Sequence, residues 1–109
     1  MAKEDGVYIK QIQDAASKIE DFVSGLTRDD FRSDLKTQSS VIMQLIIIGE
    51  TSKKISEETK RKIDLPWKDV MGFRDEAVHN YFDLDLDIVW NTIQEDLPLL
   101  RKKFEEAGL

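Results

Sequence analysis

The sequence predicts an all-α fold, a bundle of four or five helices that run up and down around one core. Apolar residues recur at spacings of three and four along most of the chain, which is the period of an amphipathic helix. No segment sustains the alternating pattern of a strand. Charged residues make up 35% of the chain, against a usual share of about 25%. So much surface relative to core is typical of a helical bundle.

Length and composition exclude several classes of protein. The 109 residues suit one domain spanning 1–109, since separate cores normally need roughly 100 to 150 residues each. The chain has no Cys and a single His, which excludes disulfide frameworks, thiolate zinc sites, cysteine nucleophiles and a His-rich metal site within one chain. We therefore expect no metal and no cofactor.

The sequence has no segment that suits a membrane. Its N-terminal residues lack the apolar stretch of a signal peptide. The longest apolar run, Leu45 to Ile48, is far shorter than the roughly 20 residues that span a bilayer. We expect a cytoplasmic protein that makes no membrane contact.

The first predicted helix carries apolar residues on one face and ends near Gly25. Thr27 followed by Asp30 resembles a capping arrangement. It predicts a short second helix that carries Phe31 and Leu35. The apolar face of the first helix consists of Tyr8, Ile12, Ala15, Ala16, Ile19, Phe22, Val23 and Leu26.

One long helix is predicted from Thr37 to about Lys62. The apolar run that begins at Val41 could form a strand by itself, but a strand usually ends within about ten residues and only Gly49 interrupts the segment as a turn residue. Gly49 then lies inside a helix, at a cost of roughly 1 kcal/mol relative to Ala. We expect the close approach of a neighbouring helix to compensate for this cost.

Pro66 marks the start of the next helix, because a proline in the first helical turn has no N–H to leave unpaired. We predict that this helix runs from about Pro66 to Phe82. In the last helix, Pro98 should introduce a kink or loosen one turn. The apolar residues of the last helix are expected to form core or dimer contacts: Trp90, Ile93, Leu97, Leu100 and Phe104.

Asp83, Asp85 and Asp87 imitate the opening of a calcium loop. Such a loop needs Gly at its sixth position for a sharp turn, and Ile88 stands there. We therefore expect these aspartates to cap the last helix and to interact with its dipole.

Charge is unevenly distributed along the chain. The formal net charge is −6, which argues against a protein that coats nucleic acid nonspecifically. Seven acids and no Lys or Arg lie between Asp75 and Asp96. The main basic cluster would by default be a solvated helix face, and it is also the candidate contact for RNA or an acidic partner: Lys53, Lys54, Lys60, Arg61 and Lys62.

The single histidine, His79, lies among residues suited to phosphate chemistry, with Arg74 before it and Asn80 and Tyr81 after it. Arg grips phosphate oxygens with two N–H groups, and His exchanges a proton near neutral pH. RNA cleavage without a metal needs the 2′-hydroxyl as nucleophile, a base and a cation that stabilises the transition state. A lone His on a helix is also often structural.

Helix geometry separates these residues. At about 100° per residue, Arg74 and Tyr81 fall within about 20° of each other, while His79 lies about 140° from Arg74. Either the helix is distorted near Ala77 to His79, or a second subunit brings a complementary Arg and His to the same cleft. We favour the second alternative, since one His per chain becomes two in a symmetric dimer.

Several segments together resemble the HepT-like branch of the HEPN superfamily. The most specific element is Arg, four residues, His, one residue, Tyr, which corresponds to Arg74, His79 and Tyr81. The resemblance extends from about residue 38 to residue 104. It also includes IIIGE at 46–50, LPWKDVMGFRD at 65–75, HNYF at 79–82, DLDIVW at 85–90 and LPLL at 97–100.

The resemblance implies a HEPN-like homodimer with metal-independent endoribonuclease activity, which acts as the toxin of a prokaryotic toxin-antitoxin pair. Its antitoxin would be a minimal nucleotidyltransferase, called MNT. Arg74 and His79 correspond to the catalytic pair, with Asp75 and Asn80 in supporting positions. Asp75 stands where the family often has Asn. Tyr81 corresponds to the residue to which the nucleotidyltransferase attaches AMP, which blocks the toxin.

A different class of function is a non-catalytic helical module that binds a nucleotide or a nucleotidyltransferase partner. In that case Arg74 and His79 are structural residues or phosphate contacts only. The acids that flank the motif favour this alternative, because they would repel RNA near the site.

Overall fold

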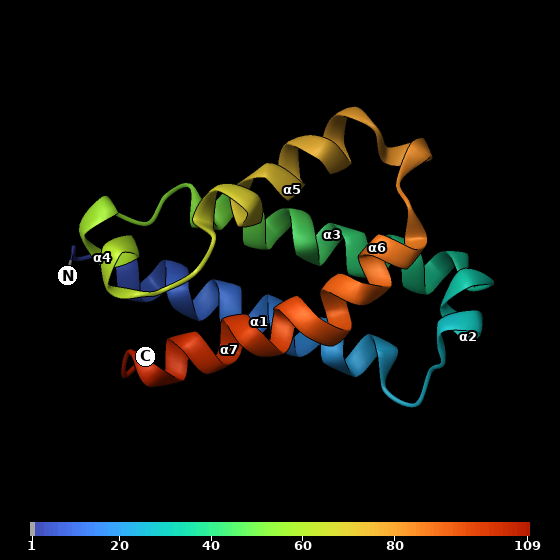
Figure 1. The fold of residues 1–109 in the computed structure, drawn as a ribbon, viewed down its shortest axis with the longest axis horizontal. Helices are drawn as coiled ribbons and strands as arrows, with labels where there is room; N and C mark the ends of the chain where they lie inside the picture. Colours follow the sequence, from blue (N-terminus) through green and yellow to red (C-terminus); the bar gives the residue numbers. More distant parts are fainter. Residues whose placement is uncertain (1) are drawn as a thin grey trace.

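The computed structural model describes residues 2–109, and every regular element in that range is helical, so the predicted all-α fold is confirmed. Four segments run up and down along the long axis: α1 (Asp5–Val23), α3 (Leu35–Ser52), α5 (Trp67–His79) and α7 (Leu97–Glu106). Figure 1 shows α2 (Arg28–Arg32) at one end of this bundle and α4 (Glu57–Lys62) at the other, beside both chain termini. None of the helices in residues 2–109 is long and apolar enough to cross a membrane.

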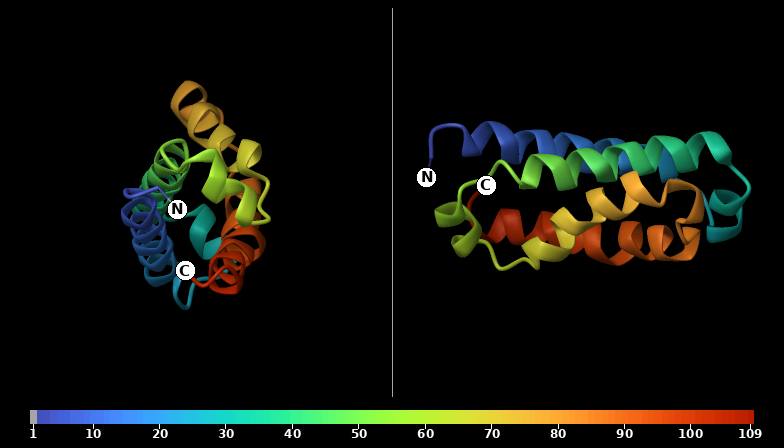
Figure 2. Two further views of the ribbon diagram at one scale, coloured as in Figure 1. Left: turned by 90° about the vertical axis from the view of Figure 1, so that its left-hand side faces the viewer. Right: turned by 90° about the horizontal axis from the view of Figure 1, so that it is seen from above.

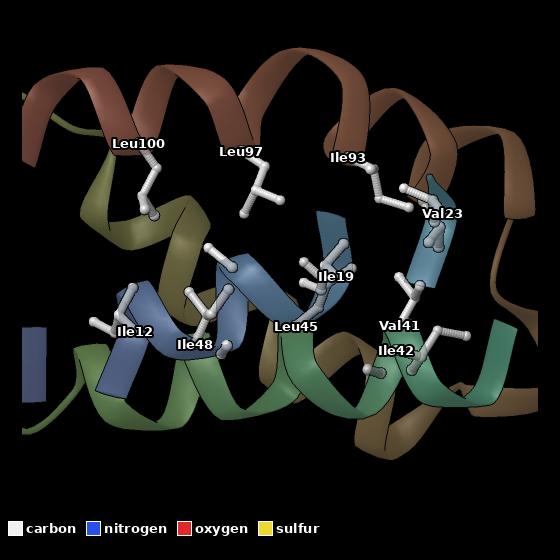
Figure 3. Packing of buried hydrophobic residues seen from close by; sticks show 14 of the residues in the cluster. Ile12, Ile19, Val23, Val41, Ile42, Leu45, Ile48, Ile93, Leu97 and Leu100 are labelled. Atoms are coloured by element: carbon white, nitrogen blue, oxygen red, sulfur yellow. The ribbon is translucent and has the colours of Figure 1, made fainter. Parts of the chain in front are cut away.

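The core lies between α1, α3 and α7. In Figure 3, Ile93, Leu97 and Leu100 face Leu45 and Ile48 across the interior. All five apolar residues predicted for the last helix are buried, so their assignment as contact residues is confirmed for the core. Figure 2, viewed along the bundle, shows α5 on the outer side of α3 and away from α1.

Helix α1 ends as predicted. Gly25 follows the helix with a φ of +78°, a backbone conformation that glycine adopts without the steric cost of a side chain. Most of the predicted apolar face is buried, but Phe22 is 40% exposed and lies at its edge.

Helix α2 begins with the capping box that the sequence predicts. The Thr27 hydroxyl accepts a hydrogen bond from the Asp30 N–H at 3.2 Å, and the Asp30 carboxylate accepts one from the Thr27 N–H at 3.0 Å. The cap aims Phe31 into the core, where its ring lies 5.4 Å from that of Trp90. Leu35, which we assigned to this short helix, instead opens α3 and is exposed.

The single long helix predicted over 37–62 is wrong, because the chain leaves helical geometry after Ser52 and re-enters it in α4. Ser56 caps α4, and its hydroxyl accepts a hydrogen bond from the Thr59 N–H. The buried carboxylate of Asp5 accepts hydrogen bonds from the Ser56 N–H at 3.1 Å and from the Ser56 and Thr59 hydroxyls at 2.6 Å each. Asp5 is distant in sequence, so local periodicity does not reveal the break.

Gly49 lies at a close approach between α3 and α5, as the sequence predicts. A Cβ at this position would be 2.9 Å from the Arg74 Cβ and 3.1 Å from the Val70 carbonyl oxygen. Both distances are too short for an ordinary contact, so only glycine allows α5 to pack here. The contact brings Arg74 directly against α3.

Helix α5 ends at His79, three residues before the predicted end at Phe82. Asn80, with φ −128° and ψ 35°, leaves the helix, and Tyr81–Asp83 form the 3₁₀ turn η1. At the other end, the Trp67 indole donates to the backbone carbonyls of Lys60 and Ile63 at 3.1 Å each. The Trp67 ring also stacks on Phe104, which joins the start of α5 to α7.

The last predicted helix consists of α6 (Leu86–Asn91), the π-helical turn η2 (Thr92–Asp96) and α7. The loosened turn lies just before Pro98, so the predicted distortion is confirmed. The expected cap is also present, since the Asp85 carboxylate accepts hydrogen bonds from the N–H groups of Asp87 and Ile88. Asp87 in turn accepts a hydrogen bond from the Arg32 Nε at 2.9 Å, which ties α6 to α2.

Candidate active site

Arg74 projects from α5 at its contact with α3. Its Nε lies 2.8 Å from a carboxylate oxygen of Glu50, and one terminal nitrogen donates to Asp75 at 3.2 Å. The Arg74 side chain is one-third exposed, so it remains within reach of a ligand from solvent. Glu50 immediately follows Gly49, whose missing side chain permits this proximity.

Asp75 extends the contact between the two helices. Its carboxylate accepts a hydrogen bond from the Lys53 ammonium at 3.0 Å. The hydrogen bonds from Lys53 and then Arg74 hold the pKa of the Asp75 carboxyl below its ordinary value. Glu50, Arg74, Asp75 and Lys53 thus form a chain of alternating charges across the two helices, which we call the α3–α5 charge chain.

His79 is the last residue of α5, and its side chain is exposed. Its imidazole forms no hydrogen bond or ion pair with any other residue in the range 2–109. Helix α5 is regular from Trp67 to His79, so the distortion considered above is not observed. On a regular helix, positions five residues apart, such as Arg74 and His79, point about 140° from each other.

Tyr81 does not share a helix face with Arg74, because α5 ends before it. The expectation that Arg74 and Tyr81 lie within about 20° of each other on one helix is therefore wrong. The Tyr81 hydroxyl lies 3.1 Å from the Ser39 hydroxyl near the start of α3, and its ring packs edge-on against Phe82. Ser39 is eleven residues before Glu50, which is about 16 Å along the axis of α3. Tyr81 and Arg74 are therefore held at opposite ends of the α3–α5 contact. Asn80, beside Tyr81, is exposed.

The basic cluster is divided by the break between α3 and α4, so the predicted single helix face is wrong. Lys53 belongs to the α3–α5 charge chain, and the Lys54 ammonium lies 5.8 Å from the centre of the Tyr8 ring. Lys60 is 6% exposed and lies over the Trp67 ring. Arg61 and Lys62 remain exposed at the end of α4.

A pocket of about 210 Å³ lies on another side of α5, between α3, α5 and α7. Its lining is mainly apolar and includes Asp69 and Asp96 but no Lys, Arg or His. Burial, followed by the charges of Glu95 and Asp69, raises the pKa of the Asp96 carboxyl. This chemistry does not suit a phosphate, so the pocket is separate from the candidate active site.

The residue that sequence reasoning missed is Glu50. The sequence could have indicated Glu50, because a glycine inside a helix marks a close contact with another helix. A polar residue next to that glycine borders the contact. Ser39 had no such signal, because its role depends on where α5 ends. Within residues 2–109, no group of three or more His, Asp or Glu side chains is arranged to hold a metal ion.

Comparison with known proteins places this arrangement in a family. The model of a family described as Ribonuclease HepT-like matches residues 12–107. A protein of Thermococcus cleftensis named "Probable ribonuclease HepT" is 41% identical over 100 residues, which cover 91% of each chain. "Putative RNase MJ0127" of Methanocaldococcus jannaschii is 34% identical over 97% of this chain and 89% of its own.

A bacterial relative, "Putative RNase TTE0752" of Caldanaerobacter subterraneus, is 32% identical over 91% of this chain and 89% of its own. No solved structure matches the chain significantly. The family model covers nearly the whole bundle, including α5 with Arg74 and His79. The chain belongs to the HepT-like ribonuclease family.

Proposed function

We propose that this chain is a metal-independent endoribonuclease that acts as a homodimer and serves as the toxin of a toxin-antitoxin pair. One observation carries the proposal. In a chain of the HepT-like ribonuclease family, the motif residues Arg74 and His79 lie on one helix, and both are accessible from solvent.

The dimer is supported by the directions of these two side chains. Because they diverge by about 140° on a regular helix, a single chain offers a phosphate either the arginine or the histidine. A second copy related by a twofold axis would place its histidine opposite the first arginine. The same region carries exposed apolar side chains suited to a covered interface: Met43, Val78, Tyr81 and Phe82.

The chemistry requires only the groups present in such a dimer. His79 takes the proton of the RNA 2′-hydroxyl while the 2′-oxygen forms a bond to phosphorus. The bond from phosphorus to the 5′-oxygen breaks, and the departing oxygen takes back the proton that the same His79 accepted. Arg74 stabilises the negative charge that develops on the phosphate oxygens. The products are a 2′,3′-cyclic phosphate and a free 5′-hydroxyl.

Tyr81 is proposed as the residue that an MNT nucleotidyltransferase modifies with AMP. Its hydroxyl lies on the exposed turn η1, and its one hydrogen-bond partner among the described residues is the Ser39 hydroxyl. An AMP group there would add negative charge and bulk beside the proposed dimer contact, where RNA must bind.

A subunit-mixing experiment tests the shared site. Arg74→Ala and His79→Ala dimers should each be inactive on RNA in EDTA and should keep their helical content. When the two variants exchange subunits, each mixed dimer has one cleft with an intact arginine and an intact histidine. Activity should return to roughly a quarter of the native value, since about half the dimers are mixed and each has one working cleft.

If the site were contained within one chain, the mixed dimers would be inactive. Full activity of His79→Ala alone would overturn the proposed chemistry. Inactive native protein that still binds a nucleotide or a nucleotidyltransferase would favour the non-catalytic module, for which the acids around the motif remain an argument.

The toxin role is tested in cells. Expression of the native chain should slow growth, and co-expression of an MNT nucleotidyltransferase should restore growth together with a mass increase of one AMP on the chain. Tyr81→Phe should prevent the mass increase. A native chain that is harmless when expressed alone would contradict the proposed toxin role.

A further inference from the structure

We infer that Glu50 is a positioning residue, which holds the Arg74 guanidinium in the orientation that the proposed ribonuclease reaction requires. The geometry of this inference comes from the contact between α3 and α5. Its consequences for catalysis rest on the proposed function.

Carboxylates lie at two of the three nitrogens of the guanidinium. Glu50 is 2.8 Å from Nε, and Asp75 accepts a hydrogen bond from one terminal nitrogen at 3.2 Å. The other terminal nitrogen has no partner among residues 2–109. Arg carries five N–H groups in a rigid fork. The remaining N–H groups are therefore available for phosphate oxygens, while Glu50 forms an ion pair at Nε.

Glu50 is better placed than Asp75 to set this orientation. Asp75 is the neighbour of Arg74 on the same helix, and it shares its carboxylate with Lys53. Glu50 comes from α3 and contacts Arg74 across the point where Gly49 permits close packing. The direction of the guanidinium therefore depends on the packing of two helices rather than on a flexible surface pair.

The carboxylate of Glu50 also repels RNA, and this makes the inference testable. A purely electrostatic account predicts that Glu50→Gln improves RNA binding and leaves kcat unchanged. The positioning account predicts that kcat falls by about tenfold in Glu50→Gln and by up to about a hundredfold in Glu50→Ala, because a misplaced catalytic group slows the reaction step itself. In both variants KM should stay constant or decrease.

Glu76→Gln is the matched control, since Glu76 is an exposed acid on α5 without an ion pair among the described residues. It changes the net charge equally and should leave kcat unchanged. Glu50 is about half exposed, so neither substitution should change thermal stability appreciably. If kcat is unchanged in Glu50→Ala, or falls equally in Glu76→Gln, the inference is overturned.

A double-mutant cycle tests whether Glu50 acts through Arg74. Arg74→Lys removes the Nε edge, so adding Glu50→Ala to it should lower kcat by less than twofold further. Losses that multiply in the double variant would mean that Glu50 acts independently of Arg74, contrary to the inference.

The side-chain NMR signal of the Arg74 Nε–H group gives a readout separate from catalysis. In the native protein the nearby Glu50 carboxylate should shift this signal, and the shift should disappear in Glu50→Ala but not in Glu76→Gln. The same signal in native and Glu50→Ala protein would refute the positioning role even if RNA is cleaved. A Glu50-dependent shift without RNA cleavage would instead refute the proposed function alone.

Discussion

Gly49 determines, at the scale of a single residue, where Arg74 lies. The sequence indicates a close helix contact at this glycine, and the contact is confirmed. The identity of the opposing residues was not predictable, because the periodicity of α3 does not determine how far α5 is displaced along it. Arg74, Glu50 and Gly49 meet only once that displacement is known.

Gly49→Ala should destabilise the fold by about 1–3 kcal/mol, because the added methyl would overlap the backbone of α5. Gly72→Ala is the matched control. A Cβ at Gly72 would have no neighbour within 4 Å, so alanine there should stabilise α5 by up to about 1 kcal/mol. Urea unfolding of both variants measures the difference, and a Gly49→Ala protein as stable as Gly72→Ala would show that α5 moves freely on α3.

Asp5 makes the stability of the fold depend on pH. Burial alone would raise the pKa of its carboxyl, but the hydrogen bonds from Ser56 and Thr59 outweigh burial and lower it below the ordinary value. A lowered pKa in the folded state gives stability that is present above about pH 4 and is lost as the pH falls through the folded-state pKa.

We expect Asp5→Asn to reduce the free energy of unfolding by about 1–3 kcal/mol at neutral pH, since the hydroxyls of Ser56 and Thr59 lose a charged acceptor. Unfolding measured across a pH series should show the gap from native protein shrinking below about pH 4. A gap that stays constant into strong acid would contradict the charged state of Asp5.

At the scale of elements, the short helix α4 separates basic residues that look equivalent in the sequence. Local pattern predicted where α1 ends and where α2 and α6 begin, because the caps lie within a few residues of the apolar faces they border. The break before α4 depends on Asp5, and the end of α5 before Tyr81 leads into a turn that contacts Ser39. Such tertiary contacts are not visible in local periodicity.

Lys60→Ala and Lys62→Ala should change different properties, the first the stability of the fold and the second the salt dependence of RNA binding. Lys60 is buried over Trp67, so its loss should cost about 1–2 kcal/mol of stability through lost packing and leave the salt dependence of RNA binding unchanged. Lys62 is exposed, so its loss should change stability by less than about 0.5 kcal/mol. If α4 contacts RNA, the Lys62 variant should reduce the slope of log affinity against log salt by up to about 1. Thermal unfolding and binding titrations at several salt concentrations distinguish the two.

At the scale of the whole molecule, the fold class and the motif residues could be predicted from the sequence, but only the structure shows that α5 is a regular helix ending at His79. The exposed apolar residues near the motif come from α3, the end of α5 and η1, which are distant in sequence. Their proximity depends on the up-and-down path of the chain (Figure 1).

Phe82 is 97% exposed, so Phe82→Ser should leave the folded chain intact while weakening the proposed dimer. Sedimentation of this variant at micromolar concentration should show monomers. RNA cleavage should fall because the dimer is lost, and it should recover as the protein is concentrated. Ile88→Ser is the control, since Ile88 is also an exposed apolar side chain and belongs to a different element, α6. Unchanged association in Phe82→Ser would place the dimer contact on another face.

The hydrogen bonds of Asp5 join two parts of the chain that are 51 positions apart. Fraying of the first turn of α1 removes the acceptor that holds the Ser56 N–H, so the two segments should open as one cooperative unit. Amide hydrogens at the start of α1 and around Ser56 should then exchange with deuterium at the same free energy of opening. Lys53, in the α3–α5 charge chain, lies three residues before Ser56. Opening of the first turn of α1 should therefore also free the loop between Lys53 and Ser56.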